Sequence, residues 1–134
     1  MVVEKEYAGA HAERIAMKNL LRLEEAMMLL LAIYLSTYLP FPGWMFWAFF
    51  LAPDVGFIGY AVNARIGAIT YNLLHHKAVA LALYMTGLLA DIPALQFVGL
   101  VMFGHSSFDR MLGYGLKYSD SFHNTHLGRI GKAD

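Results

Sequence analysis

The sequence has 134 residues, of which 58% are hydrophobic and 15% are charged, whereas about 25% of the residues in an ordinary soluble domain are charged. Ten basic and ten acidic residues give a net charge of zero, which excludes the strongly basic surface typical of a nucleic-acid-binding protein. The sequence contains no cysteine, so thiolate metal sites and disulfide bonds within the chain are excluded. This composition favours a single-domain integral membrane protein whose main partner is the lipid bilayer.

The first 19 residues are polar and charged, and they lack the short apolar core and the cleavage site of a signal peptide. We expect residues 1–19 to form a helical segment that lies outside the bilayer or along its surface. Insertion into the membrane then depends on the helices that follow.

Four long apolar stretches come next, and each is predicted to be a transmembrane helix. They are residues 20–39, 44–62, 66–90 and 94–116. The breaker sequence Pro40-Phe41-Pro42-Gly43 separates the first two, and Pro53 interrupts the second. Residues 20–116 therefore predict an all-α fold, a four-helix transmembrane bundle.

Lys and Arg residues gather in the N-terminal segment, in the second turn and in the C-terminal tail, whereas the first and third turns contain none. The positive-inside rule then places both termini in the cytoplasm. The polar residues 117–134 are predicted to form a C-terminal cytoplasmic tail that caps the mouth of the bundle.

Ionisable residues lie inside the apolar stretches, where a charge costs about 2.5–3.5 kcal/mol near the bilayer centre. With a rise of about 1.5 Å per residue, several lie roughly 10–16 Å from the cytoplasmic ends of their helices. These are Asp54, His75, His105 and Asp109. Because their depths match, we predict that the four side chains converge in one polar cluster.

The spacing within this set suggests a metal site. His105 and Asp109 are four residues apart, so they share a helix face. Imidazole and carboxylate ligands suit a divalent transition metal such as zinc or manganese. The predicted metal ligands are Asp54, His75, His105 and Asp109. The alternative is a purely structural His–Asp hydrogen bond that satisfies both groups at low dielectric.

Two further patterns concern the same cluster. His75 and His76 point about 100° apart on a helix, so only one of them should face the centre, and His75 shares its face with Asn72. Pro53 lacks an N–H group and frees a backbone carbonyl one turn earlier, which membrane helices tolerate where a polar partner is present.

Three segments carry a resemblance to a known family. They are Tyr71-Asn72-Leu73-Leu74-His75, the run from Asp109 to Tyr118, and Thr125-His126-Leu127-Gly128-Arg129. They resemble domain of unknown function family 4260, a family of small bacterial integral-membrane proteins without an assigned activity. The resemblance covers roughly residues 20–132 and implies a membrane fold in the bacterial inner membrane, but no function.

The order Pro53-Asp54, His75-His76, His105…Asp109 is also similar, more loosely, to that of membrane-bound metal-dependent hydrolases. That pattern includes a His-Arg-Gly…Thr-His-Ser stretch, where this chain has only Asn72…His75-His76. The chain therefore has one histidine fewer than the hydrolase pattern requires.

Two functions of different classes remain open. One is a metal-dependent hydrolase at the cytoplasmic leaflet, in which Arg110 is the expected catalytic residue that stabilises a developing negative charge. The other is a non-enzymatic accessory or scaffold subunit of a larger membrane complex. Its polar cluster would be structural, or a histidine would ligate a tetrapyrrole metal. A homo-oligomer is compatible with either function.

Overall fold

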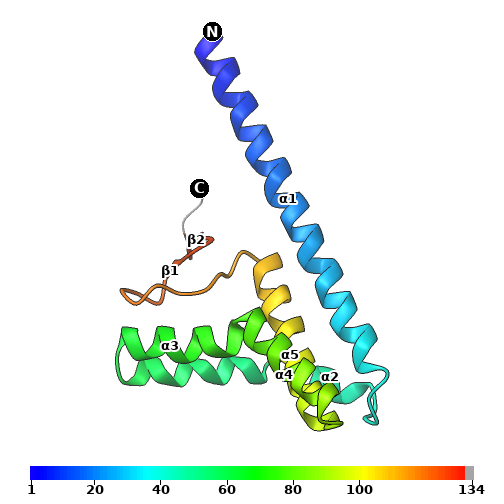
Figure 1. The fold of residues 1–134 in the computed structure, drawn as a ribbon. Helices are drawn as coiled ribbons and strands as arrows, with labels where there is room; N and C mark the ends of the chain where they lie inside the picture. Colours follow the sequence, from blue (N-terminus) through cyan, green and yellow to red (C-terminus); the bar gives the residue numbers. More distant parts are fainter. Residues whose placement is uncertain (132–134) are drawn as a thin grey trace.

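The computed structural model describes residues 1–131 and consists almost entirely of helices, as the sequence predicts (Figure 1). The elements are α1 (Val2–Ser36), α2 (Trp44–Ala48), the 3₁₀ helix η1 (Ala52–Ala61), α3 (Ala64–His75), α4 (Lys77–Leu89) and α5 (Pro93–Met111). A small antiparallel hairpin follows, formed by β1 (Asn124–Thr125) and β2 (Gly128–Arg129).

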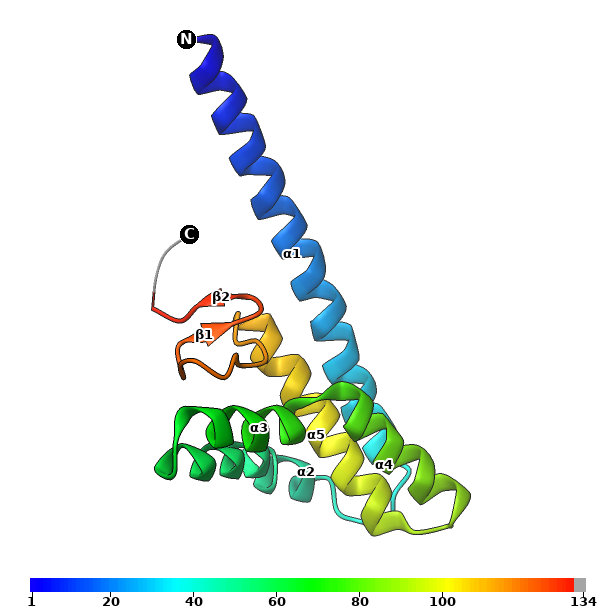
Figure 2. The ribbon, with the colours of Figure 1, turned by 60° about the vertical axis from the view of Figure 1, so that its left-hand side comes forward.

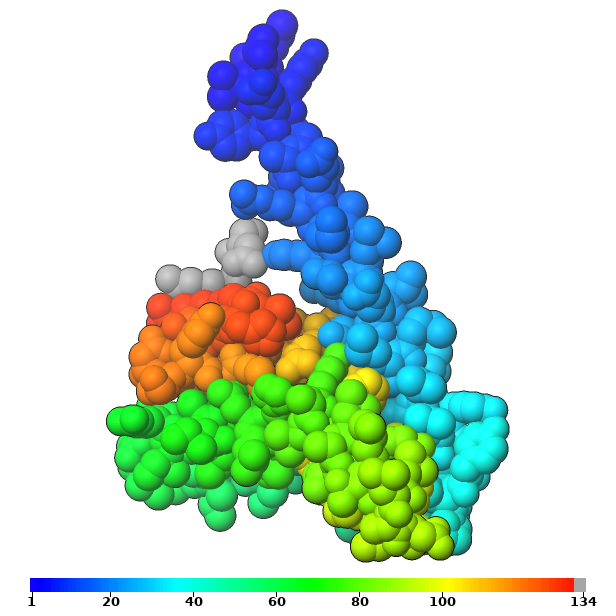
Figure 3. All heavy atoms as spheres, in the orientation of Figure 1, coloured from blue at the N-terminus to red at the C-terminus, as the bar shows by residue number. Residues whose placement is uncertain are grey.

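Helix α1 is one continuous helix that contains both the predicted surface segment and most of the first predicted span. No proline lies between Val2 and Ser36, so nothing in the sequence breaks the helix before the turn at residues 40–43. Its N-terminal half is exposed and stands clear of the rest of the molecule (Figure 3). Residues 2–19 are therefore continuous with the helix that contains most of the first apolar stretch.

Helix α5 is the centre of the fold and packs against α1 on one side and α4 on the other. Small residues on α5 allow α4 and α1 to pack closely against it. A Cβ atom at Gly99 would lie 2.6 Å from the carbonyl oxygen of Ala80 on α4, and one at Gly104 would lie 3.3 Å from the Cβ atom of Ala32 on α1. The hydrophobic core around them is filled mainly by phenylalanines, among them Phe46.

The 3₁₀ helix η1 and helix α3 form a hairpin that projects to one side across α5 (Figure 2). Asn63 begins α3, because its Oδ1 atom accepts a hydrogen bond from the backbone N–H of Ile66 at 2.8 Å. Thr70 ties the two helices together by donating from Oγ1 to the carbonyl oxygen of Gly56 at 2.6 Å. The hairpin places Asp54 near the C-terminal end of α3.

The third predicted span, residues 66–90, is not one helix. His76 has φ −89° and ψ 115°, an extended conformation that ends α3 and precedes α4. The two helices leave this residue in different directions (Figure 1). Within residues 1–131, one stretch, Trp44–Ala61, is long and apolar enough to cross a membrane. Four spans with cytoplasmic termini stay a prediction.

The C-terminal tail docks on the helices, as expected of a cap. The side-chain amide of Asn72 donates to the carbonyl oxygen of Lys117 at 2.8 Å and accepts from its backbone N–H at 2.7 Å. Nδ1 of His126 accepts from the backbone N–H of Leu116 at 2.8 Å. The last predicted tail residues, 132–134, lie outside the described part of the chain.

Candidate functional site

The four predicted metal ligands meet in one cluster. Their ligand atoms, one from each residue, all lie within 4.8 Å of one another. Helix η1 supplies Asp54, α3 supplies His75, and α5 supplies both His105 and Asp109. The convergence predicted from matched depths is thus confirmed.

His105 has its ring orientation fixed by the backbone. Its Nδ1 atom lies 2.7 Å from the carbonyl oxygen of Phe50, and a carbonyl can only accept, so Nδ1 carries the proton and donates it. In a 3₁₀ helix the N–H group three residues later would occupy that oxygen, but residue 53 is proline and has none. The carbonyl freed by Pro53 therefore fixes the tautomer of His105.

His75 is fixed in the same way. Its Nδ1 atom lies 2.9 Å from the carbonyl oxygen of Tyr71, so this nitrogen also donates. The ring of Tyr71 stacks on the imidazole with 3.7 Å between centroids and 14° between planes. His75 is only 2% exposed, so its imidazole ring has little freedom to rotate. His76 is exposed, which confirms that only one of the two adjacent histidines faces the cluster.

When its ring is neutral, each histidine therefore directs an unprotonated Nε2 atom at the same point. The two Nε2 atoms are 3.0 Å apart. Oδ1 of Asp54 lies 3.1 Å from Nε2 of His105 and 3.3 Å from that of His75. Oδ2 of Asp109 lies 3.3 Å from Nε2 of His75 and 3.4 Å from that of His105. Four electron-pair donors thus surround one point, and a positive charge there would satisfy all four.

The two carboxylates lie in different surroundings. The Asp54 side chain is 37% exposed, whereas that of Asp109 is 15% exposed. Oδ2 of Asp109 also accepts a hydrogen bond from the hydroxyl of Tyr71 at 3.2 Å. Tyr71 was not among the predicted site residues. Tyr71 precedes His75 by four residues and so shares its helix face, and this spacing could have predicted Tyr71 as a site residue from the sequence.

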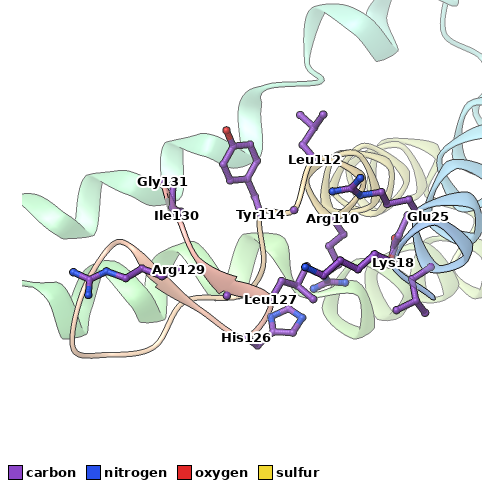
Figure 4. A pocket seen from close by; sticks show the side chains of 14 residues that line it. Lys18, Glu25, Arg110, Leu112, Tyr114, His126, Leu127, Arg129, Ile130 and Gly131 are labelled. Carbon is purple, nitrogen blue, oxygen red and sulfur yellow. The ribbon is translucent and has the colours of Figure 1, made fainter. Parts of the chain in front are cut away.

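Arg110, the predicted catalytic residue, lies beside the cluster. Its Nη2 atom donates to the carbonyl oxygen of His75 at 3.3 Å, which satisfies one of the carbonyls left free at the C-terminal end of α3. Arg110 lines a small hollow, too narrow to hold a water molecule, together with His75 and Asp109. It also lines a larger cleft of about 580 Å³ between α1 and the tail (Figure 4).

Two lysines near the site, the half-buried Lys77 and the buried Lys117, were not predicted as site residues. Lys77 forms an ion pair with Glu25 that joins α4 to α1. Lys117 is 5% exposed; its Nζ atom donates to the carbonyl oxygen of Phe122 at 2.9 Å and lies 3.8 Å from the centre of that ring. Burial lowers the pKa of Lys117, while the charge of Asp109 opposes the shift.

Glu25 of α1 and Lys117 of the tail each interact with groups other than one another. Glu25 pairs with Lys77 of α4, and Lys117 is held by aromatic rings and a carbonyl oxygen. The tail is therefore fixed to the helices mainly by the Asn72 amide, whereas the ring of His126 joins two parts of the tail by accepting from the backbone N–H of Leu116.

Comparison with known proteins gives one match. Neither the curated proteins nor the solved structures contain a significant match to this chain. One protein family matches residues 18–130, a range that includes every residue of the cluster. The chain belongs to that family, which is described as a domain of unknown function (DUF4260).

Proposed function

We propose that the cluster of Asp54, His75, His105 and Asp109 holds one divalent transition metal, zinc or manganese, and that the protein is a metal-dependent hydrolase at the cytoplasmic face of the bacterial inner membrane. The observation that carries the proposal is the pair of histidine tautomers. Both Nδ1 atoms donate to backbone carbonyls, so both Nε2 atoms are free to coordinate. Metal-binding histidines are typically held by this kind of hydrogen bond from the other ring nitrogen.

The spacing of the donor atoms also fits a metal. A tetrahedral site with bonds of about 2.0–2.1 Å separates neighbouring ligand atoms by about 3.3 Å. Five separations within the cluster lie between 3.0 and 3.4 Å. Neutral imidazole nitrogens and carboxylate oxygens at these distances would repel one another without a cation or a shared proton. The donor set is therefore arranged as a coordination sphere.

The hydrolase proposal rests on the surroundings of the donors. A transition metal held by these four residues would need a water molecule as a fifth ligand, and it would lower the pKa of that water toward about 7, which supplies a nucleophile at neutral pH. Asp54 lies on the exposed side of the cluster, where a substrate can approach. Arg110 lies beside the buried side and adjoins the larger cleft. Its guanidinium is the group proposed to stabilise negative charge that develops on the substrate.

The membrane placement is supported by exposed apolar side chains. Monomeric soluble proteins rarely expose contiguous apolar patches larger than a few hundred Å². Here exposed apolar residues follow one another along several elements: Leu23, Met27, Leu30 and Leu31 on α1, Leu51, Val55 and Ile58 at η1, and Met85, Leu88 and Leu89 on α4. Together with the apolar stretch Trp44–Ala61, they favour a chain whose outer surface contacts lipid.

Metal analysis tests the metal site directly. The full-length protein, purified in detergent and incubated with zinc or manganese, is expected to keep about one equivalent after desalting, as a single four-ligand site predicts. His105→Ala should lose the metal, whereas His76→Ala, which changes an exposed histidine next to the cluster, should keep it. Equal metal content in both variants, or none in the wild type, would refute the site.

Activity measurements separate the enzyme from a scaffold. Metal-loaded protein is expected to hydrolyse chromogenic phosphate or carboxylate esters in mixed micelles. Arg110→Gln should retain the metal and lose most of the rate, since its guanidinium makes no contact with a ligand atom that the cluster needs. A protein that binds one metal but hydrolyses neither ester class would favour the accessory-subunit function.

A further inference from the structure

The larger cleft beside the cluster has the chemistry of an anion-binding site. It has a volume of about 580 Å³ and lies between α1, the end of α5 and the C-terminal tail. Cationic side chains line it from all three segments: Lys18 and Arg22 from α1, Arg110 from α5, and Arg129 from the tail. Figure 4 shows Lys18 and Glu25 on α1, and Arg110 at the end of α5, on the side of α1 that faces the tail.

Three of the cations that line the cleft are arginines, Arg22, Arg110 and Arg129. Glu25 is the one carboxylate among the lining residues within the described part of the chain. Its carboxylate is already engaged with Lys77 of α4. Arginine presents several N–H donors in a planar fork that suits phosphate oxygens. The guanidinium groups that line the cleft therefore favour a ligand with a phosphate group.

The cleft is also partly apolar and lies where α1 changes character. Leu21, Leu112, Leu127 and Ile130 line it beside the cations. Six of the 17 residues from Val2 to Lys18 are charged, against three of the 17 from Leu20 to Ser36. Basic side chains at such a boundary lie at the depth of lipid headgroups. The cleft thus offers a cationic pocket with apolar walls at the expected membrane surface.

Arg110 connects this cleft to the metal cluster. It lines both the cleft and the small hollow that contains His75 and Asp109. Resting on the metal-dependent function proposed above, we infer that the cleft binds the phosphate group of an amphiphilic substrate, a phospholipid or a related phosphorylated lipid. Arg110 then contacts the phosphate on the side that faces the cluster. The substrate of the hydrolase is thereby a phosphate ester and not a carboxylate ester.

Binding to chelator-treated protein tests the cleft separately from the metal. Isothermal titration calorimetry would measure the affinity of the detergent-solubilised, full-length protein for dihexanoyl phosphatidate and for inorganic phosphate. Arg22→Gln and Arg129→Gln are expected to weaken binding of dihexanoyl phosphatidate about tenfold each, as expected for the loss of a charge-assisted hydrogen bond. Arg14→Gln is the matched control, because it removes the same charge from α1 outside the cleft.

The outcomes of this experiment distinguish a lipid phosphate from a free phosphate, and a failure of the cleft from a failure of the metal site. Tighter binding of dihexanoyl phosphatidate than of inorganic phosphate supports a lipid ligand. Equal binding of the two probes would contradict the lipid and leave a free phosphate as the ligand. No binding of either probe, or equal losses in the Arg22 and Arg14 variants, would overturn the cleft as a phosphate site. His105→Ala should retain phosphatidate binding in every case, so a failure of the metal site does not imitate a failure of the cleft.

Discussion

Pro53 and His105 lie on different helices, and a single backbone carbonyl connects them. Pro53 cannot donate to the carbonyl oxygen of Phe50, and Nδ1 of His105 donates to that oxygen at 2.7 Å instead. The proline thus acts on the chemistry of a residue 52 positions later in the sequence, because it leaves open the acceptor that sets the tautomer of the histidine.

Restoring the N–H group at position 53 should weaken the metal site. In Pro53→Ala, the new amide can occupy the carbonyl oxygen of Phe50 and compete with His105. Loss of such an outer hydrogen bond typically costs about 10–100-fold in metal affinity. Competition with a chromophoric chelator would measure the metal dissociation constant. Pro42→Ala is the control, and an unchanged affinity in the Pro53 variant would contradict the link between these two residues.

The hydroxyl of Tyr71 should stabilise the cluster through Asp109. Tyr71→Phe keeps the ring that stacks on His75 and removes only the donor to Oδ2 of Asp109. We expect a loss of about 1.5–3 kcal/mol in the free energy of unfolding, the usual range for a hydrogen bond to a charged group. Urea titration of metal-free protein would measure it. Tyr118→Phe, which changes an exposed tyrosine, should have little effect; equal losses in both variants would contradict the role of Tyr71.

The Asn72 side chain should hold the tail in place. Asn72→Ala removes both hydrogen bonds to the backbone of Lys117. Hydrogen exchange followed by mass spectrometry is expected to show faster exchange in residues 116–130 and unchanged exchange in the core of α5. His123→Ala, in the exposed part of the tail, is the control. Unchanged exchange in the Asn72 variant would show that other contacts dock the tail.

The fold of the tail should loosen below neutral pH because of His126, which joins two parts of the tail through Leu116. Burial and the nearby charge of Arg110 lower the pKa of His126 in the folded protein, while Glu25 opposes the shift. The undocked imidazole has a pKa of about 6.5, so it binds more protons than the docked one as the pH falls below that value. Protonation of Nδ1 also removes the acceptor for the N–H group of Leu116.

The stabilising contribution of His126 is thus fully present above pH 6.5 and is lost as the pH falls toward the lowered pKa of the folded state. Exchange of residues 116–130, corrected for the intrinsic pH dependence of exchange, should increase between about pH 6.5 and 5. This increase should be absent in His126→Gln, whose amide can still accept. The same increase in both proteins would contradict the assignment to His126.

The members of the cluster could be predicted from the sequence because an ionisable side chain in an apolar stretch has few places where it is stable. Asp54, His75, His105 and Asp109 were identified by that cost and by matching depth. The choice of His75 over His76 followed from helical geometry alone.

The path of the chain around the cluster could not be predicted in the same way. The break at His76 has no proline or glycine to announce it. Helix α3 ends there because of tertiary contacts. The ring of His75 is held in the cluster, and Arg110 donates to the backbone carbonyl oxygen of His75. Lys117 likewise gave no signal, since its stabilisation comes from aromatic rings that are distant in sequence, including Tyr71 at 4.7 Å.

The zinc coordination of the full-length protein tests the central claim most directly. X-ray absorption at the zinc edge, recorded on protein loaded with one equivalent of zinc in detergent, reports the number and type of the atoms bound to the metal. The account predicts about four nitrogen and oxygen neighbours at roughly 2.0–2.1 Å, with the outer-shell scattering of two imidazoles that disappears in a His75→Ala, His105→Ala double variant. A spectrum without imidazole scattering, or one that the double variant leaves unchanged, would contradict the metal site on which the proposed function rests.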